Sequence, residues 1–454
     1  MNLKRFIGDK AFYKEALAVA VPLMTQQLIM SSVNLVDNLM VGQLGDAAIG
    51  GVGVANRFYM IANFAVNGLI CATAIFVAQY YGARDEEHLK QTFRFSIIGS
   101  LVFMLLFSLL VLFNPILIVE FFTKDPLYIT QGSSYLSMVV YSFLPAALTM
   151  ALASALRTIG ETKIPLVVNM VAVFINCFFN YIFIFGHFGA PAMGVVGAAL
   201  ATLISRVIEC ILLLLMVLKY DFPFKTKLSE IFHIEFDLIK RITIKAFPLL
   251  TNEILWSFGM AMLLKLYATR GADVITAYSV SGTVTDIFFS LFGGMAGATA
   301  ILIGQRLGAN KLEEAKSHAY HLLFFAVTLA IVFGGLIIIS SFIFPSLYDL
   351  TPHTHELASN LIRVCGSLFW IYMINTEIYF ILRSGGDTKA TLLMDSCFMW
   401  GVNIPIIACL AYFTDFNIYV IYIVGQLTDL IKMVVATYFF KKEKWVKNLT
   451  IVEE

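Results

Sequence analysis

Apolar residues run through this chain in long stretches without charge. Residues 95–113 and 322–347 contain no Asp, Glu, Lys or Arg. About 20 apolar residues in a helix cross the roughly 30 Å hydrocarbon layer of a bilayer, so each stretch is long enough to span it. Strands of a membrane β-barrel would alternate over about ten residues instead, and these stretches do not. The pattern predicts an all-α membrane protein with twelve transmembrane helices, at residues 13–43, 48–80, 91–113, 130–155, 164–186, 190–218, 240–268, 274–304, 316–345, 356–382, 389–411 and 415–440.

The composition agrees with a membrane protein. Of the 454 residues, 59% are hydrophobic and 13% are charged, with a mean hydropathy of +0.83, whereas soluble domains carry about 25% charged residues. The net charge of +1 gives no indication of a nucleic-acid partner. The six cysteines lie in predicted helices without a CxxC pair, so we interpret them as small apolar side chains. The first fifteen residues lack the apolar core of a cleavable signal peptide, so the first helix is expected to direct insertion.

The second half of the chain repeats the first at a constant offset of 226 residues. The recurring segments are 72–75 with 298–301, and 156–163 (Leu-Arg-Thr-Ile-Gly-Glu-Thr-Lys) with 382–389 (Leu-Arg-Ser-Gly-Gly-Asp-Thr-Lys). We expect the second pair to form tight helix–helix turns in which Gly160 and Gly386 supply the flexible position. The repeat predicts two homologous lobes, residues 1–220 and 238–454, joined by a cytoplasmic linker at 221–237. Six helices per lobe is an even number, so both lobes enter the bilayer in one orientation, as a parallel repeat.

Lysine and arginine gather in alternate loops, which predicts the orientation. The loops assigned to the cytoplasm hold Arg84, Lys90, Arg94, Arg157, Lys163, the basic residues of 219–245, Arg306, Lys311, Lys316, Arg383 and Lys389, and the opposite loops hold Lys124 and Arg270. This asymmetry predicts that both termini are cytoplasmic.

Asp37 is the most informative polar residue inside the predicted bilayer. A charge near a helix centre costs about 2.5–3.5 kcal/mol, and the repeat places an apolar residue at the same position of the other lobe. Asn176 and Asn180 lie i,i+4 on one helix face, and Asn34 adds a further amide. The hypothesis is that this group binds a Na⁺ ion or holds a proton. The alternative is a hydrogen-bonded set that only fixes the first helix against the fifth.

Glu253 lies near the middle of the predicted seventh helix, and its counterpart is Gln27, which is polar but not ionisable. A carboxylic acid at this depth is suited to exchanging a proton for a cation, and the alternative is a permanently protonated group bonded within its lobe. Pro22 and Pro248 lie at matching positions inside the same two helices, where each removes a backbone hydrogen bond. A fixed kink is the default interpretation, and a hinge beside the two acids is the functional hypothesis.

Other intramembrane charges allow a structural interpretation. Asp286 is expected either to line a cavity or to pair with Lys265. Glu377 lies six residues from Arg383, so we interpret it as reaching toward the cytoplasm. The residues interpreted as structural are Arg206 paired with Glu209, Asp429 paired with Lys432, and Asp395.

Several short segments resemble the multidrug and toxic compound extrusion (MATE) family. They are Val36-Asp37, Val41-Gly42-Gln43-Leu44-Gly45, Gln79-Tyr80-Tyr81-Gly82-Ala83 and residues 156–163, in a chain of two parallel six-helix lobes. The resemblance implies efflux of small amphipathic, often cationic compounds in exchange for Na⁺ or H⁺, with no other cofactor. It implies cation coupling at Asp37 and cation or substrate binding at Glu253. We expect a monomer that crosses the bacterial cytoplasmic membrane many times.

Two positions depart from the pattern of the family. Some members have an aspartate in place of Asn180, and others have an aspartate on the tenth helix in place of Tyr372. The coupling ion therefore stays open. The residues predicted to line a substrate cavity are Gln27, Asn34, Asp286, Tyr372 and Glu377.

Two other functions would place different demands on the sequence. A flippase for a lipid-linked saccharide would need cationic residues for an anionic substrate, and the available arginines are Arg57, Arg206 and Arg363. An intramembrane enzyme would need a metal or nucleophile cluster, whereas the seven histidines lie in loops or near helix ends. The chain has no GxxxxGK[ST] loop, HExxH pair or nucleophile elbow, so we expect neither ATP hydrolysis nor another enzyme activity.

Overall fold

The structure is a computed structural model that describes residues 7–348 and 350–451, apart from the side chains of Asn34, Leu35, Asn38, Asp46, Leu228 and Ala272. These ranges contain helices and no strand. Twelve helical segments are long and apolar enough to cross a membrane. The prediction of an all-α protein with twelve transmembrane helices is confirmed. The helices divide into two compact units, of residues 25–246 and of residues 1–24 with 247–454.

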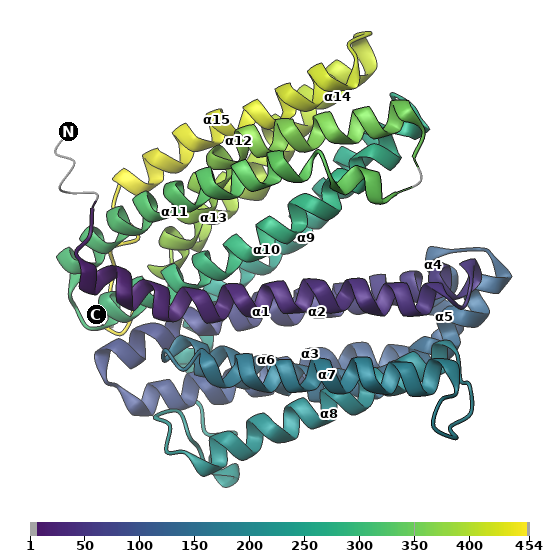
Figure 1. The fold of residues 1–454 in the computed structure, drawn as a ribbon. Coiled ribbons are helices and arrows are strands. Elements are labelled where there is room, and N and C mark those ends of the chain that lie inside the picture. Colours follow the sequence, from purple (N-terminus) through teal and green to yellow (C-terminus); the bar gives the residue numbers. More distant parts are fainter. Residues whose placement is uncertain (1–6, 349, 452–454) are drawn as a thin grey trace. The chain divides into compact units, whose positions relative to one another are not determined.

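The unit of residues 25–246, here called the N unit, contains most of α1 and nine further helical segments (Figure 1). Their bounds are α1 (Lys10–Gly42), α2 (Asp46–Ala83), α3 (Glu86–Phe113), α4 (Pro115–Phe122), α5 (Pro126–Val139), η2 (Val140–Ser142), α6 (Phe143–Thr158), α7 (Lys163–Phe185), α8 (Val195–Lys219) and η3 (Leu228–Glu230). Helix α2 packs on α3 and α5, while α8 packs on α5, α6 and α7. Apolar residues at helical spacing, such as Val66, Leu136 and Phe143, form the core between them.

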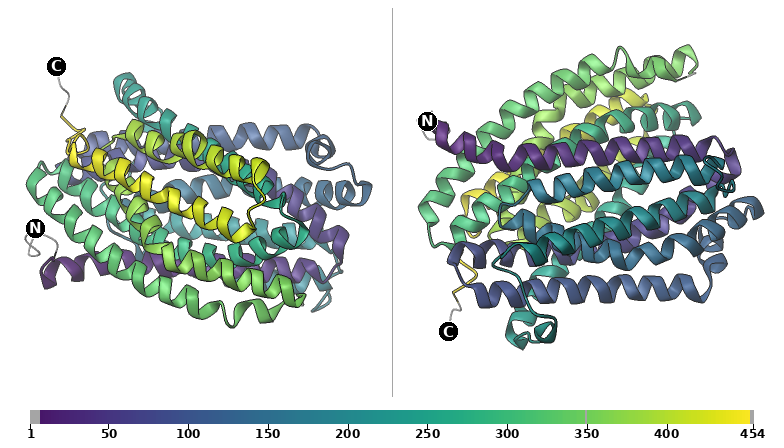
Figure 2. Two further views of the ribbon diagram at one scale, coloured as in Figure 1. Left: turned by 90° about the horizontal axis from the view of Figure 1, so that it is seen from above. Right: turned by 60° about the horizontal axis from the view of Figure 1, so that its bottom comes forward.

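The other unit, here called the C unit, repeats this arrangement with later helices. Its helices are α9 (Phe236–Ala268), α10 (Ala272–Gly308), α11 (Leu312–Ser340), η4 (Phe344–Leu347), α12 (Pro352–Ser384), α13 (Thr388–Leu392), η5 (Leu393–Cys397), η6 (Met399–Asn403), α14 (Ile404–Phe413) and α15 (Ile418–Lys441). Helix α12 packs on α10, α11 and α15, as Figure 2 shows for the green and yellow helices. The helices of the N unit make the equivalent contacts, so the repeat in the sequence is a repeat of packing.

Each unit also contains the first turns of a helix that continues in the other unit. The C unit includes α1 up to Met24, and the N unit includes α9 up to Ala246. Pro22 and Pro248 are buried inside these two helices, which both continue through the proline. The predicted lobe boundaries and the predicted hinges stay predictions.

Local signals explain where several helices begin and end. Asp85 caps α3 by accepting a hydrogen bond from the backbone of His88 at 3.2 Å, with two glutamates in the first turn. Both predicted turns are present: α6 ends at Thr158 before Gly160 with φ 98°, and α12 ends at Ser384 before Gly386 with φ 74°. Positive φ favours glycine at these two positions.

Small residues allow a close helix crossing in the C unit. A Cβ atom on Gly366 would lie 2.8 Å from the carbonyl oxygen of Gly334, so α11 and α12 meet backbone to backbone. Van der Waals packing is the main attraction between helices in lipid, and small residues permit it.

Two elements differ from the predicted ones. The short helix α4 was not predicted. The eleventh membrane segment, predicted as one regular helix at 389–411, contains two π-helical stretches at Leu393–Cys397 and Met399–Asn403. Such stretches are rare and frequently occur at functional sites. Hydrophobic periodicity cannot reveal them, because one altered turn leaves the overall apolar character unchanged.

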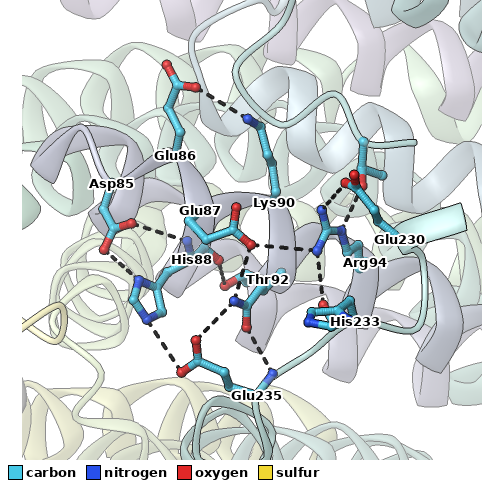
Figure 3. Close-up of polar contacts among 12 residues, drawn as sticks. Asp85, Glu86, Glu87, His88, Lys90, Thr92, Arg94, Glu230, His233 and Glu235 are labelled. Carbon is cyan, nitrogen blue, oxygen red and sulfur yellow. Dashed lines mark hydrogen bonds and ion pairs between the residues drawn. The ribbon is translucent and has the colours of Figure 1, made fainter. Parts of the chain in front are cut away.

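Buried Arg94 fixes the predicted linker to the first turns of α3 (Figure 3). Its guanidinium donates to the hydroxyl of Thr226 at 2.7 Å, to Glu230 at 2.9 Å and to the backbone oxygen of His233 at 3.0 Å. Gln91 adds a hydrogen bond in each direction with Glu235, at 3.2 and 2.9 Å. The connection is therefore held by a polar network although it contains little regular structure.

Replacing Arg94 by Ala is expected to open the linker to proteases. Hydrogen bonds to charged groups contribute about 1.5–3 kcal/mol each, so loss of this set predicts roughly tenfold or faster cleavage by trypsin at Lys225 and Lys227, counting about 1.4 kcal/mol per tenfold. Lys90→Ala is the matched control, because its ion pair with Glu86 is solvent-exposed. Equal cleavage rates in the Arg94 variant and the wild type would show that the network does not hold the linker.

Candidate cation site

One face of α7 carries three buried asparagines. Asn169, Asn176 and Asn180 lie at i, i+7 and i+11, a spacing that returns to the same side of a helix. They are 4%, 6% and 2% exposed. Amide groups this deeply buried need partners, because an unpaired polar group in an apolar environment is costly.

The facing side of α8 supplies hydroxyls and charges. Thr202, Ser205, Arg206 and Glu209 recur at i, i+3, i+4 and i+7, again one helix face. Figure 1 shows α7 and α8 side by side, in agreement with their extensive packing. Two polar helix faces therefore meet inside the N unit.

Asp37 of α1 is the acid bound by the α7 amides. The side-chain nitrogen of Asn180 donates to Oδ1 of Asp37 at 2.7 Å. The amide of Asn176 satisfies its neighbours with its nitrogen toward Asp37, where it donates to both carboxylate oxygens, at 2.9 and 3.3 Å. The three residues predicted from the sequence to act together are in contact.

Glu209 forms a second charged centre beside Asp37. Its carboxylate accepts from Arg206 at 2.8 Å and from Asn169 at 3.1 Å, and its side chain is 5% exposed. The predicted pairing of Arg206 with Glu209 is confirmed. The side-chain oxygens of Asn169 and Asn180 are buried and accept no hydrogen bond from the described residues.

These groups surround a cavity of about 60 Å³. Its polar lining comprises Asp37, Asn169, Asn176, Thr202, Arg206 and Glu209, with Ser205 beside them. A water molecule occupies about 30 Å³ in the liquid, so the cavity suits a small ion or one or two waters. It is too small for a drug-sized molecule, which needs roughly 300 Å³ or more.

The acid predicted on the seventh helix lies in the C unit. Glu253 is half-buried on α9, next to Asn252, whose amide binds a different carboxylate. Its counterpart Gln27 is half-buried on α1 in the N unit. The side chain of Asn34 lies outside the described residues. Neither Glu253 nor Gln27 is among the described residues that line the cavity around Asp37.

The predicted cavity residues of the C unit are scattered. Asp286 is exposed on α10, and no ion pair joins it to Lys265 among the described side chains. Tyr372 is half-buried against Phe289, with ring centroids 4.6 Å apart. An open hollow of about 430 Å³ in this unit is lined instead by Leu255, Phe258, Ala261, Met262, Lys265 and Trp400.

The interpretation of Glu377 as reaching toward the cytoplasm is wrong. Its side chain is 0% exposed between α12 and α10, where it accepts a hydrogen bond from the hydroxyl of Thr299. Its second oxygen has no partner among the described residues. Six residues along a helix amount to about 9 Å of rise, and the packing of α12 on α10 keeps the carboxyl away from Arg383.

The predicted pair of Asp429 with Lys432 forms no ion pair within 4.0 Å among the described residues, because Lys432 binds Asp395, and Asp429 acts on Lys432 at longer range. The Lys432 ammonium lies 2.6 Å from Oδ1 of Asp395, with side chains 12% and 18% exposed. Asn252 of α9 donates to Oδ2 of the same carboxylate at 3.0 Å. Asp395 lies in the π-helical stretch η5, which directs it toward both α9 and α15.

The sequence contained a signal for the second charged centre. Arg206 and Lys432 occupy one repeat position, and so do Asn169 and Asp395. A basic residue kept in both lobes indicated a shared structural requirement. The participation of Asn169 and Thr202 in the cavity depends on the orientation of two helix faces, which spacing alone does not give.

Two homologous halves of membrane-length helices, with an ion-sized charged cavity in one of them, define a multi-pass membrane transporter. The MatE family model matches residues 22–182 and 248–408, two equal segments at the offset of the repeat. The chain belongs to the MatE family, whose members export multidrug and toxic compounds, and its expected membership is confirmed. Members of this family are transporters of small organic molecules. No group of three or more His, Cys, Asp and Glu side chains placed to hold a metal ion occurs in the described ranges.

Similar proteins cover nearly the whole chain. The uncharacterized transporter YisQ of Bacillus subtilis is 26% identical over 82% of this chain and 81% of its own length. The probable multidrug resistance protein NorM of Thermotoga maritima is 22% identical over 97% and 95%. The corresponding NorM of Haemophilus ducreyi is 26% identical over 85% and 84%.

Solved structures share the fold. A crystal structure of MATE in complex with MaL6 superposes with a TM-score of 0.88 at 17% identity, covering 97% of this chain and 98% of the other. A MOP superfamily transporter from Pyrococcus furiosus gives 0.87 at 17% identity, covering 97% of each chain. The two-lobe architecture of these transporters is therefore also the architecture of this protein.

Proposed function

We propose that the protein is a secondary active antiporter that exports amphipathic, cationic compounds in exchange for Na⁺ or H⁺. The observation that carries this proposal is Asp37, a carboxylate held by two amides in a cavity of ionic size within one half of a duplicated bundle. At the same position the other half has Leu263. An acid kept in only one lobe has a role other than maintaining the common fold.

The chemistry of this group suits reversible binding of a monovalent cation. When the site is empty, Asn180 and Asn176 direct N–H groups at the carboxylate and stabilise its charge. When a cation binds, rotation of the Asn176 amide brings its oxygen to the same place, and the buried oxygen of Asn180 is available as well.

Ion and substrate are coupled when the binding of each weakens the binding of the other. Binding of Na⁺ or H⁺ neutralises the acid, which weakens the electrostatic attraction for a positively charged compound. The effect is reciprocal, because a coupling free energy between two ligands acts equally on both. Glu253 is the second proposed acid of this exchange, and Pro22 and Pro248 are the proposed flexible points of α1 and α9.

The charges of the helices argue against an anionic substrate. Arg206 is neutralised by Glu209 at 2.8 Å. Arg363 donates to Ser341 at 3.1 Å and to Asn360 at 3.2 Å, and its guanidinium stacks on the ring of Phe342. A flippase for a lipid-linked saccharide would need such arginines free for phosphate. We further propose a monomer in the bacterial cytoplasmic membrane with both termini in the cytoplasm.

Ion gradients applied one at a time test this function. Purified protein in liposomes is given ethidium, an amphipathic monovalent cation, with either an inward Na⁺ gradient or a pH gradient. We expect ethidium flux against its concentration with one of the two gradients and none when that gradient is collapsed by an ionophore. Flux that is equal with and without every gradient would overturn the antiporter proposal.

A further inference from the structure

We propose that Arg206 is a built-in cation that Glu209 keeps away from Asp37, so that the site requires one monovalent ion from outside. The inference rests on the proposed antiport at Asp37 and adds two residues that set its charge balance. Both act on the ion through Asp37, so they are positioning residues.

The argument begins with the charges that share the cavity. Asp37 and Glu209 are carboxylates and Arg206 is a guanidinium, and all three line the same volume of about 60 Å³. The described side chains that line the cavity include no further Asp, Glu, Lys or Arg. The guanidinium of Arg157 acts on Glu209 from outside this lining, and it donates to Gln26 at 3.4 Å. The charges that line the empty site therefore sum to −1. One Na⁺ or one proton makes it neutral, which suits a buried site because unbalanced charge there is costly.

The contacts determine which carboxylate holds the guanidinium. Glu209 is 5% exposed, and its carboxylate receives Arg206 on one oxygen and Asn169 on the other. Glu209 lies i,i+3 from Arg206 on α8, a spacing at which helix side chains meet. Asp37, in contrast, is bound by the neutral amides of α7. Arg206 is 33% exposed and lines the cavity that Asp37 shares, so it has room to turn toward the second acid.

The repeat supports this division of roles. Lys432 occupies the position of Arg206 in the second lobe, and Asp395 holds it at 2.6 Å. Asp395 occupies the position of Asn169. Each lobe therefore keeps a basic residue on its sixth helix and supplies it with a close carboxylate, although the carboxylates come from different helices. The acid that remains for an external cation, Asp37, occurs at that position in the first lobe alone.

Removing the negative charge of Glu209 and removing the positive charge of Arg206 should shift the ion dependence in opposite directions. With Glu209→Gln, Arg206 loses its partner and turns to Asp37, so the site becomes neutral without an ion. With Arg206→Gln, the empty site has a charge of −2 and attracts cations more strongly. The double variant Glu209→Gln/Arg206→Gln restores the charge of −1, so it should regain the ion requirement that the first single variant lost.

The experiment measures ion binding and ion-driven ethidium flux of the full-length protein. Binding of radioactive Na⁺ is followed if Na⁺ drives the wild type, and proton release on ethidium addition in weak buffer if H⁺ does. We expect Glu209→Gln to weaken ion binding at least tenfold, Arg206→Gln to tighten it at least threefold, and the double variant to return within about threefold of the wild type. Melting temperatures identify variants that fail to fold, and Arg206→Gln keeps the test decisive if Glu209→Gln is one of them.

The inference is overturned if Glu209→Gln keeps the ion dependence of the wild type. It is also overturned if the double variant binds the ion no more tightly than Glu209→Gln does. Asp37→Asn separates this outcome from failure of the antiporter proposal. If Asp37→Asn abolishes ion-driven flux while Glu209→Gln behaves as the wild type, only the role of Arg206 is wrong. If Asp37→Asn also behaves as the wild type, the proposed function at Asp37 fails with it.

Discussion

Replacing Asp37 by Asn is expected to abolish ion-driven ethidium transport while leaving the fold intact. Asn has nearly the same shape as Asp, so the packing between α1 and α7 is kept. The bound cation loses its formal counter-charge, an attraction of about 4 kcal/mol for charges about 4 Å apart at an effective dielectric constant of about 20. At about 1.4 kcal/mol per tenfold, ion affinity should fall by two to three orders of magnitude.

The measurement is gradient-driven ethidium flux in liposomes, with ethidium binding in detergent measured separately by fluorescence. Ethidium binding should weaken in the Asp37 variant, because the neutral side chain resembles the ion-bound acid and no longer attracts a cation. Asp221→Asn is the matched control, since its side chain is fully exposed and it removes one carboxylate without touching the cavity. Ion-driven flux at the wild-type rate in Asp37→Asn would refute the assignment of Asp37.

The contact of Asp37 with the asparagines was predictable because helical periodicity is a strong constraint. Asn176 and Asn180 are one turn apart, so an acid that meets one of them meets both. The offset of the repeat then distinguished Asp37 from the charges common to both lobes. Periodicity and repeat together predicted the fold and the contact of Asp37 with both asparagines.

The residues that escaped prediction depend on distances between helices. Lys432 was assigned to Asp429 from their spacing on one helix, but the π-helical stretch of the preceding segment brings Asp395 closer. Glu377 was assigned to the headgroup region from its distance along the helix to Arg383, but packing against Thr299 decides its environment. Both errors have one cause. Spacing along the sequence shows which side chains are close on one helix, but it does not show which side chains meet between helices.

The same limit explains why the place of Glu209 beside Asp37 was not predicted. Its pairing with Arg206 was correctly predicted from i,i+3 spacing, and the pair was therefore interpreted as self-contained. The cavity that Arg206 shares with Asp37 is formed by the crossing of α1, α7 and α8. A pair that looks neutral along one helix thus becomes part of a three-charge group in the folded unit.

Replacing Lys432 by Met is expected to destabilise the C unit strongly. Asp395 would remain largely buried with only the amide of Asn252 at 3.0 Å to stabilise its charge. Removing one partner of a buried ion pair typically costs about 3–5 kcal/mol, because the other charge is left uncompensated. Unfolding is followed by heating the detergent-solubilised protein and recording the fluorescence of its tryptophans, one of which, Trp400, lies on η6 and donates to the backbone of α9 at 2.9 Å.

The double variant Lys432→Met/Asp395→Leu shows whether the pair itself or only its disruption matters. Well-packed apolar residues often replace a buried ion pair at little cost, so this variant should recover most of the lost stability. Lys90→Met is the surface control: its pair with Glu86 at 3.4 Å is 28% and 66% exposed, and such pairs are worth about 0–1 kcal/mol. A single variant as stable as the wild type would mean that Asp395 does not need Lys432 for its charge. A double variant as unstable as the single one would instead assign the loss to the apolar stem of the lysine.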